Sequence, residues 1–343
     1  MTVSAPIVPC ARQAEVISSM AAFVDDRMDE LLKPVAESWQ PADHLPDLTG
    51  PDWREELGDF RRQAARLPDE VLVVLTGDMV TEEALPAYQA WLNRLRGLED
   101  PTGASDSPWA RWGRGWTAEE NRHGDLLNRY LFLSGRVDMR AIEGTIHHLI
   151  RNGFDARTGH DPYLGFVYAS FQERATKISH RNVGELARRA GEPQLHRICG
   201  LIAADEARHE RAYKLFMSQV FTLDPDGAVL AFARMMRAKV VMPAELMDDG
   251  GGDGLFARFA RVAQRTGIYT AADYADIIDT LVTEWNVPGL THLSGDAAEA
   301  QDYLGGLAAR YRRLAERGER GRKEGAERFS WIRPRARGEA PDR

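Results

Sequence analysis

The chain has 343 residues, of which 43% are hydrophobic and 28% charged, a composition typical of globular proteins. Its net charge of −8 argues against a general nucleic-acid-binding protein and against one that adheres to anionic membrane surfaces. The two distant cysteines, Cys10 and Cys199, make no disulfide framework, no apolar run approaches the roughly 18 residues of a membrane-spanning helix, and MTVSAPIVPCARQAEV lacks a signal-peptide pattern. We therefore expect a cytoplasmic protein with no membrane insertion and no nucleic-acid partner.

The N-terminal part of the chain is predicted to be helical. Residues 11–34 repeat apolar positions at helical spacing and stop at Pro34. Residues 41–51, PADHLPDLTGP, have the composition of a loop. A charged helix is predicted to follow over 52–66.

The next predicted helix, over 81–95, reads TEEALPAYQAWLNRL. Thr81 would cap its N-terminus, and the acids after it suit the positive end of the helix dipole. Pro86 is expected to kink or restart this helix. After a loop over 100–108, further helices are predicted over 109–135, 138–152, 162–190, 194–222, 226–242, 255–267, 270–285 and 297–317.

Strand alternation is scarce, and no linker rich in Pro, Gly or Ser separates two halves of the chain. We therefore predict an all-α protein with a single domain over residues 1–343, in which about 10 N-terminal and about 15 C-terminal residues are loose. A helix of about 28 residues is roughly 40 Å long and can span a helical bundle.

Two segments, WTAEENRH and IAADEARHE, share the pattern acid–Glu–x–Arg–His. The first contains Glu120 and His123, and the second contains Glu206 and His209. Residues three apart project from the same side of a helix, so each pair could bind one metal ion. About one Glu-x-x-His is expected by chance in such a composition, but the shared acid and Arg argue against coincidence.

A four-helix metal centre needs one further carboxylate from each of the two remaining helices. Glu82 or Glu83 precedes the first motif, and Glu173 precedes the second. The alternatives are that Glu83 is a surface residue and that Glu173 forms an ion pair with Arg174. Four carboxylates would balance two ferrous ions, and carboxylates with imidazoles suit iron or manganese.

The chain resembles the soluble acyl-[acyl carrier protein] desaturases, the di-iron family known best from plant plastids. The resemblance runs from ESWQPADHLPD to FSWIRPR and is carried by long segments, which include GDMVTEEALPAYQ, TGASDSPWARW, WTAEENRHGDLLNRYLFLSGRVDMRAIE, DPYLGFVYASFQERATKISH and ICGLIAADEARHE. It implies a ferritin-like four-helix di-iron bundle extended by additional helices.

The resemblance also implies a role for each candidate residue. Two Fe²⁺ per chain would be bound, one by Glu82, Glu120 and His123 and the other by Glu173, Glu206 and His209, with Glu120 and Glu206 bridging. Glu82 is thereby selected over Glu83. Thr176 is expected on the oxygen-binding side of the cluster, where it would help to deliver protons, and Trp39, His123 and Asp205 are expected to form an electron route.

The implied activity is the O₂-dependent introduction of a cis double bond into a saturated fatty acyl chain on acyl carrier protein. A ferredoxin would donate electrons, and the protein would be a homodimer. Acid–base groups cannot remove hydrogen from unactivated methylene groups, whereas a diferrous centre that reacts with dioxygen can. The alternatives are a di-iron oxygenase that hydroxylates a carrier-bound intermediate, a ferroxidase or iron-storage protein, and a metal-free helical interaction protein.

Departures from the family pattern concern the acyl channel. The resemblance places Trp91, Arg94 and Leu95 along one channel wall, and Gly165 and Phe166 along another. Plant members carry smaller or unbranched residues at the first two positions. We therefore predict that Trp91 shortens or redirects the channel, with simple core packing as the alternative.

Acyl carrier protein is acidic, so a basic docking face is expected despite the net charge of −8. The candidates are the arginines of the C-terminal basic stretch: Arg310, Arg312, Arg313, Arg317 and Arg320. A solvated basic helix end is the alternative for each of them.

Overall fold

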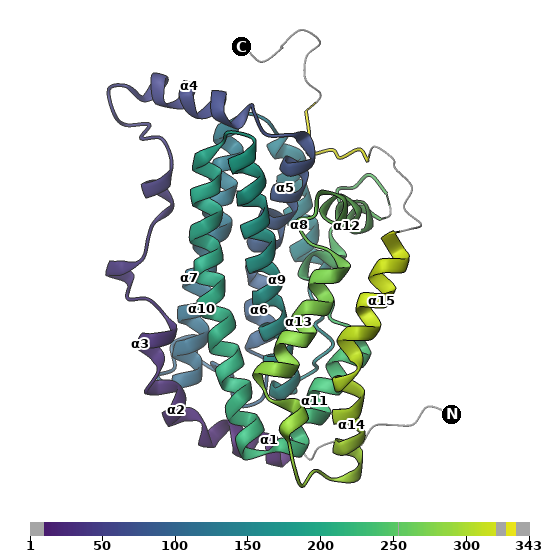
Figure 1. The fold of residues 1–343 in the computed structure, drawn as a ribbon. Coiled ribbons are helices and arrows are strands. Elements are labelled where there is room, and N and C mark those ends of the chain that lie inside the picture. Colours follow the sequence, from purple (N-terminus) through teal and green to yellow (C-terminus); the bar gives the residue numbers. More distant parts are fainter. Residues whose placement is uncertain (1–9, 253, 320–326, 334–343) are drawn as a thin grey trace.

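A computed structural model describes residues 10–252, 254–319 and 327–333. Four helices run through its centre: α5 (Asp69–Glu83), α7 (Pro108–Ser134), α9 (Pro162–Arg189) and α10 (Pro193–Leu223). The long helices α7, α9 and α10 lie nearly parallel (Figure 1). Within the described residues no strand occurs, only an isolated bridge between Val137 and Ile332. The predicted all-α bundle extended by additional helices is confirmed.

The additional helices surround this centre. They are α1 (Cys10–Ser19), α2 (Ala21–Asp25), α3 (Met28–Leu31), α4 (Trp53–Ala64), α6 (Leu85–Leu92), α8 (Met139–Asn152), α11 (Pro225–Ala238), α12 (Leu255–Thr266), α13 (Ala271–Glu284), α14 (Gly295–Gly305) and α15 (Leu307–Glu319). Short 3₁₀ turns occur at η1 (Val35–Glu37), η2 (Pro41–His44), η3 (Pro243–Leu246) and η4 (Val287–Gly289). Figure 1 shows α13 to α15 along one side, and the segment after α3 passing along the outside of the bundle towards α4.

Several helices begin with the same local device, a capping side chain followed by proline. Ser107, Asp161 and Glu192 each accept a backbone N–H from the first turn of α7, α9 and α10. Asp224 does the same for α11. Proline has no N–H to leave unpaired, and its fixed φ suits the first helical position. These caps set where the long helices begin.

The predicted helix start at Thr81 is wrong. Thr81 lies near the end of α5, where its hydroxyl donates to the carbonyl oxygen of Gly77 at 2.8 Å. The segment VLVVLTGDMV is buried on nearly every face, so it lacks the one-sided periodicity that reveals a surface helix. The chain breaks at Ala84, and Pro86 stands in the first turn of α6, which confirms the predicted restart.

Two predicted continuous helices are interrupted. Residues 11–34 form the three helices α1 to α3, because the chain bends so that Ile17, Met20 and Leu31 are all buried against the bundle. Residues 297–317 are divided between α14 and α15 at Gly306. In both regions tertiary packing overrides local periodicity.

Two hydrophobic cores share the central helices. Leu126 of α7 and Ile202 of α10 belong to one core, whereas Trp116 of α7 and Tyr213 of α10 belong to the other. The two Glu-x-x-His motifs lie between these positions on the same helices. A buried polar layer therefore crosses the bundle where the two cores meet.

The ends of the chain are only partly described. The predicted loose N-terminus lies outside the described residues except for the start of α1. Near the C-terminus, the Trp331 indole N–H donates to Thr145 Oγ1 at 2.9 Å, and the ring is fully buried. Residues 329–331 are thus packed where loose chain was predicted.

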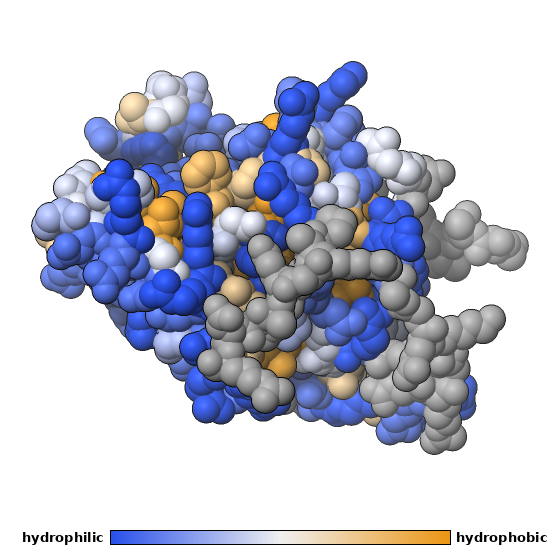
Figure 2. Space-filling model, turned by 90° about the horizontal axis from the view of Figure 1, so that it is seen from above, coloured by the Kyte–Doolittle hydropathy of each residue, from blue (hydrophilic) through white to orange (hydrophobic). Residues whose placement is uncertain are grey.

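None of the helices in the described part of the chain is both long and apolar enough to cross a membrane. The end of the molecule drawn in Figure 2 is mainly hydrophilic, with hydrophobic residues in small separate groups.

Candidate metal centre

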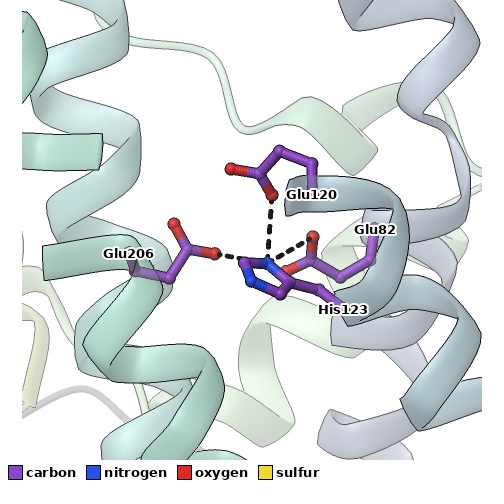
Figure 3. A group of neighbouring side chains, drawn as sticks. All are labelled: Glu82, Glu120, His123 and Glu206. Carbon is purple, nitrogen blue, oxygen red and sulfur yellow. Dashed lines mark ion pairs between the residues drawn. The ribbon is translucent and has the colours of Figure 1, made fainter. Parts of the chain in front are cut away.

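Six buried side chains form two overlapping groups in the polar layer. The first is Glu82, Glu120, His123 and Glu206, and the second is Glu120, Glu173, Glu206 and His209. Within each group, one potential ligand atom per residue lies within 4.8 Å of the others. Figure 3 shows the first group. Because Glu120 and Glu206 belong to both groups, their carboxylates are placed to bridge two metal ions.

The potential ligand atoms of the two groups face one another at short distances. His123 Nδ1 lies 3.1 Å from Glu120 Oε2 and 3.5 Å from Glu206 Oε1. The same nitrogen lies 3.9 Å from Glu82 Oε2. His209 Nδ1 lies 2.6 Å from Glu120 Oε1 and 3.7 Å from Glu173 Oε2. Both imidazoles thus direct Nδ1 at the carboxylates.

Each of the four central helices supplies its part through its own geometry. The pairs on α7 and α10 are spaced by three residues, which keeps Glu and His on the same face. Glu82 reaches the layer from the last turn of α5, which packs closely on α7 at Gly124. A Cβ at Gly124 would lie only 3.3 Å from the Glu82 carbonyl carbon, so glycine permits this approach.

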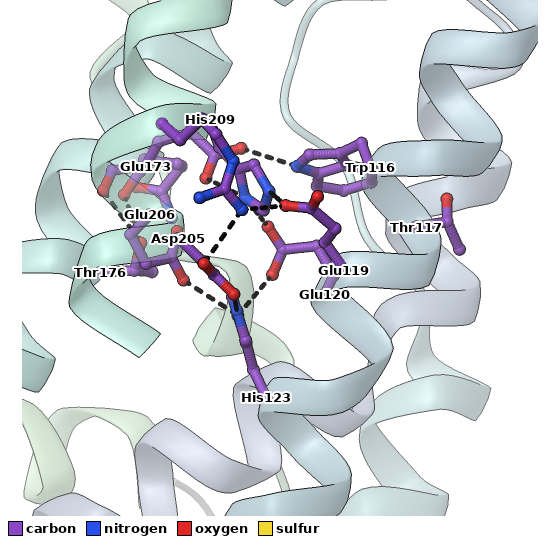
Figure 4. Close-up of polar contacts among 12 residues, drawn as sticks. Trp116, Thr117, Glu119, Glu120, His123, Glu173, Thr176, Asp205, Glu206 and His209 are labelled. Carbon is purple, nitrogen blue, oxygen red and sulfur yellow. Dashed lines mark hydrogen bonds and ion pairs between the residues drawn. The ribbon is translucent and has the colours of Figure 1, made fainter. Parts of the chain in front are cut away.

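The acid that precedes each motif contacts the histidine of the other motif (Figure 4). Glu119 Oε2 lies 2.9 Å from His209 Nε2. Asp205 Oδ2 lies 3.5 Å from His123 Nε2. A carboxylate on one imidazole nitrogen orients the ring and leaves the other nitrogen for a metal.

The two arginines of the motifs complete this outer layer. Arg208 contacts both Glu119 and Asp205 through the same nitrogen, whereas Arg122 contacts Asp205 at 3.3 Å. Arg122 also donates to the carbonyl oxygen of Trp39 at 2.8 Å. Lys33 Nζ also lies 3.8 Å from Asp205 Oδ1, so three cations face these two carboxylates. Their ion pairs are with Glu119 and Asp205 and not with the carboxylates of the two metal groups.

The two non-bridging glutamates have different aromatic partners. His180 Nε2 lies 2.9 Å from Glu82 Oε1, and the Trp116 indole N–H donates to Glu173 Oε1 at 3.1 Å. In each case the second oxygen faces the histidine of the same group. Arg174 pairs with Glu210 at 2.8 Å and not with Glu173, so the local ion pair considered from the sequence does not form.

The pKa values of the glutamates in the cluster are shifted in opposite directions. Burial raises the pKa of Glu82 to about 7, and burial with the Glu120 carboxylate raises the pKa of Glu173 well above its usual range. Burial also opposes ionisation of Glu120, but His123 and His209 outweigh it and hold that pKa below its usual range. The Glu120 carboxylate in turn raises the pKa of both imidazoles, against the effect of burial.

These residues fit a pair of divalent cations. Within the described residues, His123 Nδ1, His209 Nδ1 and Glu120 Oε1 are buried and lie within ion-pair distance of one another's side chains, but none of them makes a hydrogen bond of normal geometry. Buried polar atoms are rarely left in this state unless an ion or water completes them. Oxygen and imidazole ligands without thiolate favour iron or manganese.

Trp39 joins the cluster from the segment after α3. Its indole N–H donates to Asp205 Oδ2 at 3.0 Å. Its ring stacks on His123 with centroids 6.0 Å apart and an interplanar angle of 13°. The structure thus brings together the three residues of the expected electron route, although it does not test that route.

Two cavities meet beside the cluster. One of about 450 Å³ extends between α5, α9, α12 and α13, and one of about 70 Å³ extends towards α6. Residues of both linings include Glu82, Gln172 and Thr176. The Thr176 hydroxyl donates to the carbonyl oxygen of Gln172 at 3.1 Å. Thr176 therefore lies where the cavities meet, next to Glu82.

The smaller cavity is bounded at its far end by aromatic rings. Trp91 lies edge-on to Phe154 and Tyr168, and its indole N–H donates to Thr158 Oγ1 at 2.8 Å. Trp91 therefore both packs in the core and lines the cavity, which combines the two interpretations of the sequence.

The other channel candidates are not in the linings of these two cavities. Arg94 is exposed beyond the end of α6, so it does not share a helical face with Trp91. Leu95 is buried against Gly165, where an added Cβ would lie 2.4 Å from Leu95 Cδ1. Phe166 is buried and stacks on Trp109. Whether substrate reaches these residues stays a prediction.

Several site residues were not singled out from the sequence, although signals for some were present. Trp116 precedes Glu120 by one helical turn, and His180 follows Glu173 by two turns. That spacing could have placed both near the cluster. Glu119 was noted only as part of the repeated pattern, because nothing in a linear motif shows that it serves the other histidine.

The comparisons with known proteins agree on one family. The family model described as fatty acid desaturase matches residues 12–333. Acyl-[acyl-carrier-protein] desaturase 3, chloroplastic, of Oryza sativa subsp. indica is 56% identical over 327 residues, which cover 94% of this chain and 81% of the rice protein. Stearoyl-[acyl-carrier-protein] 9-desaturase 1, chloroplastic, of Arabidopsis thaliana is 54% identical over 323 residues, with 94% and 82% covered.

A solved structure supports the fold. The X-ray structure of DesA2 from Mycobacterium tuberculosis H37Rv aligns with a TM-score of 0.54 at 19% identity and covers 83% of this chain and 99% of that chain. At that identity it bears on the fold alone. The family model and the plant relatives together show that this chain belongs to the acyl-[acyl-carrier-protein] desaturase family of enzymes.

Proposed function

We propose that the protein is an O₂-dependent desaturase that introduces a cis double bond into a saturated acyl chain on acyl carrier protein, with a di-iron centre. The observation that carries this proposal is the pair of buried groups that share Glu120 and Glu206, beside two cavities that meet at the cluster. The plant relatives are named for action on acyl or stearoyl chains on acyl carrier protein.

The two irons would be held by the six side chains of the two groups. The bound centre supplies the reactivity towards dioxygen that unactivated methylene groups require and that acid–base side chains lack. Glu119 lies 2.9 Å from His209 Nε2 and would hold that imidazole in the tautomer that leaves Nδ1 for iron, and Asp205, 3.5 Å from His123 Nε2, would orient the other imidazole. His180 and Trp116 orient Glu82 and Glu173.

The remaining residues position substrate, protons and electrons. The acyl chain would lie in the larger cavity, pass Thr176 and end in the smaller cavity against Trp91. The Thr176 hydroxyl would hold a proton on the cavity side of Glu173. The lining is mostly apolar, which binds methylene groups and excludes water. Trp39 would connect the electron donor, a ferredoxin, with His123 through the stacked rings and Asp205.

Three further parts of the proposal rest on resemblance to the family. They are a ferredoxin as the physiological donor, assembly as a homodimer, and a cytoplasmic location. The curated plant relatives are chloroplastic, so cell fractionation of the native host tests the last part.

The first test is aerobic turnover with reductase, ferredoxin and acyl carrier protein charged with saturated chains of several lengths. Mass spectrometry should show the loss of two hydrogen atoms, and fragmentation would then locate the double bond. The gain of one oxygen atom would instead make the protein a hydroxylase of carrier-bound chains. Unchanged substrates with iron bound would contradict the proposed substrate class but not the metal centre.

A further inference from the structure

Three tryptophans follow one face of α7 and lead away from the metal centre. They are Trp109, Trp112 and Trp116, three of the eight tryptophans of the chain, and all three rings are buried. Their spacing of three and four residues continues the helical face of Glu120. The stripe therefore begins at the metal centre and extends over about 16 Å of the helix.

Two aromatic residues of α10 lie between these tryptophans. The ring centroid of Tyr213 is 6.4 Å from that of Trp116 and 5.7 Å from that of Trp112. The ring centroid of Phe216 is 5.1 Å from those of Trp112 and Trp109. Aromatic rings at such separations are in contact. We name Trp116, Tyr213, Trp112, Phe216 and Trp109, in this order, the aromatic chain.

The aromatic chain joins the metal centre to one end of the bundle. At its first ring, the Trp116 indole N–H donates to Glu173 Oε1 at 3.1 Å. At its last ring, the Trp109 indole N–H donates to the carbonyl oxygen of Ile17 in α1 at 3.1 Å. Figure 1 shows α1 at that end of the bundle. Trp109 keeps 4% of its surface exposed, so the chain ends just beneath the surface.

Packing alone does not require these residue types. On the other side of the polar layer, α10 contributes Leu195 and Ile202 to the core and has no Trp, Tyr or Phe before His209.

Two polar groups of the aromatic chain are also costly to bury. Within the described residues, the Trp112 indole N–H and the Tyr213 hydroxyl are buried and make no hydrogen bond of normal geometry. Phenylalanine at either position would avoid this cost in free energy. Tryptophan and tyrosine differ from phenylalanine in losing an electron much more readily, which indicates a redox role.

We propose that the aromatic chain supplies electrons to the metal centre when dioxygen reacts there without a bound acyl chain. This inference rests on the proposed function, because it assumes a di-iron centre that reacts with dioxygen. Conversion of dioxygen to two waters takes four electrons and four protons. In desaturation, ferredoxin supplies two of the electrons and the acyl chain supplies two hydrogen atoms. Without an acyl chain, two electrons are missing, and the oxidation would fall on the protein.

Each passage along the aromatic chain delivers one electron. Trp116 loses an electron to the centre while its indole proton shifts along the hydrogen bond to Glu173. Trp112 replaces that electron, the proton returns to Trp116, and Trp109 then replaces the electron of Trp112. Tyr213 and Phe216 bridge the tryptophan rings.

A thiol in solution restores Trp109 and closes the balance. Each thiol gives one electron and one proton, so two passages convert two thiols to one disulfide. Together with two electrons from ferredoxin and two protons from solvent, they complete the reduction of one dioxygen to two waters. The side chains of the metal centre are thereby spared from oxidation.

The test exposes the iron-loaded full-length protein to ferredoxin, reductase and dioxygen without acyl carrier protein. Trp112→Phe keeps a ring but removes the middle tryptophan, which belongs to neither metal group and lines neither cavity. Peptide mass spectrometry should find oxidised Trp109 in the wild type. In the variant, oxidation of Trp109 should be lost and oxidation of Trp116 should increase. Freeze-quenched wild-type samples should show a tryptophan radical by EPR, which deuterated tryptophan narrows.

Trp285→Phe is the matched control. Trp285 is buried in the same hydrophobic core and contacts Phe221 and Phe232 rather than the aromatic chain. This variant should keep the wild-type pattern of oxidation. Added glutathione should slow inactivation several-fold in the wild type and in Trp285→Phe, but should not protect Trp112→Phe. Iron content, and kcat and KM with charged acyl carrier protein, should be the same in all three proteins.

A second variant keeps the test decisive if Trp112→Phe does not fold. Trp109→Phe retains a ring against Phe166 but removes the last tryptophan. Oxidation should then accumulate at Trp112, and protection by glutathione should be lost.

Two outcomes would overturn the inference. One is equal oxidation of Trp109 in the wild type and in Trp112→Phe. The other is a wild-type protein that desaturates acyl chains but shows no oxidised tryptophan in the aromatic chain. A wild-type protein that desaturates no acyl chain would instead count against the proposed function, so the two failures are distinguishable.

Discussion

The two halves of the metal centre have matching inner residues but different surroundings. In the first half, His123 is stacked against Trp39, which belongs to the segment outside the bundle. In the second half, His209 lies beside Trp116, an interior residue that lines the smaller cavity. Both halves face the cavities, because Glu82 of the first half and Glu173 of the second are lining residues. The halves differ in their tryptophans: Trp39 connects the first half with the segment outside the bundle, whereas Trp116 contacts the second half from the interior.

The largest effect is expected from the residues that the halves share. Glu206→Ala removes a bridging carboxylate, so both halves should lose iron, and activity should fall by at least about 10³-fold. Metal analysis and turnover measure this. Glu83→Ala is the control, because Glu83 accepts a hydrogen bond from Asn128 and does not belong to either metal group. Full iron content in the Glu206 variant would contradict the proposed bridging role.

The tryptophans test the division between the halves directly. Trp39→Phe keeps a ring on His123 but removes the hydrogen bond to Asp205, so reduction by ferredoxin should slow by about 10- to 100-fold in stopped-flow experiments. Trp116→Phe should leave that rate unchanged and make one of the two irons more easily removed by a chelator. Equal effects of the two variants on reduction would break the comparison.

Trp91 tests whether the smaller cavity beside both halves holds the end of the acyl chain. Trp91→Met lengthens the smaller cavity, so the preference should shift towards longer chains by about 10-fold in kcat/KM. Competition between carrier proteins charged with different chains measures this shift. Arg94→Met is the control, since Arg94 is exposed and does not line the smaller cavity. An unchanged chain-length preference in the Trp91 variant would show that Trp91 only packs in the core.

Asp78 gives the smallest expected effect, on stability and not on chemistry. Burial raises the pKa of Asp78 from 3.8 to about 6, against the opposing effects of His180 and of the Ser179 hydroxyl. A carboxyl with a raised pKa in the folded state stabilises the fold only at low pH, and this contribution is lost as the pH rises from about 4 to about 6.

Asp78→Asn can still accept the hydrogen bond from Ser179 but carries no charge. Above pH 6 the variant should be more stable than the wild type by at most about 3 kcal/mol, and the difference should vanish near pH 4. Urea unfolding of the metal-free proteins across this range measures the difference. A constant difference at every pH would rule out the titration of Asp78 as its cause.

The sequence was enough to predict the class of the fold and the two motif pairs, because helical spacing is a local property. Glu120 and His123 are three residues apart on one helix, and that distance alone puts them on one face. The choice between Glu82 and Glu83 needed the resemblance. Because α5 is apolar on nearly every side, its sequence does not show which face points towards the metal centre. The false start at Thr81 has the same cause.

Relations between helices could not be predicted from spacing. Glu119 contacts His209, although it directly precedes Glu120 of the first motif. Asp205 contacts His123, although it directly precedes Glu206 of the second motif. That exchange depends on how α7 and α10 face each other. The hydrogen bonds of Arg312 to Asp276 and Asp279 likewise depend on the packing of α15 against α13. Arg320, the last of the arginines considered from the sequence, lies outside the described residues.

With iron bound as we propose, the polar layer between the two cores would make the lifetime of the protein depend on the supply of iron. A ligand that binds only the folded state adds to its stability according to its free concentration. Without metal, the same layer buries carboxylates and imidazoles that compete for protons. In a cell short of iron, we expect newly made chains to unfold and be degraded sooner. The cellular level of the protein would then depend on iron, independently of its catalytic activity.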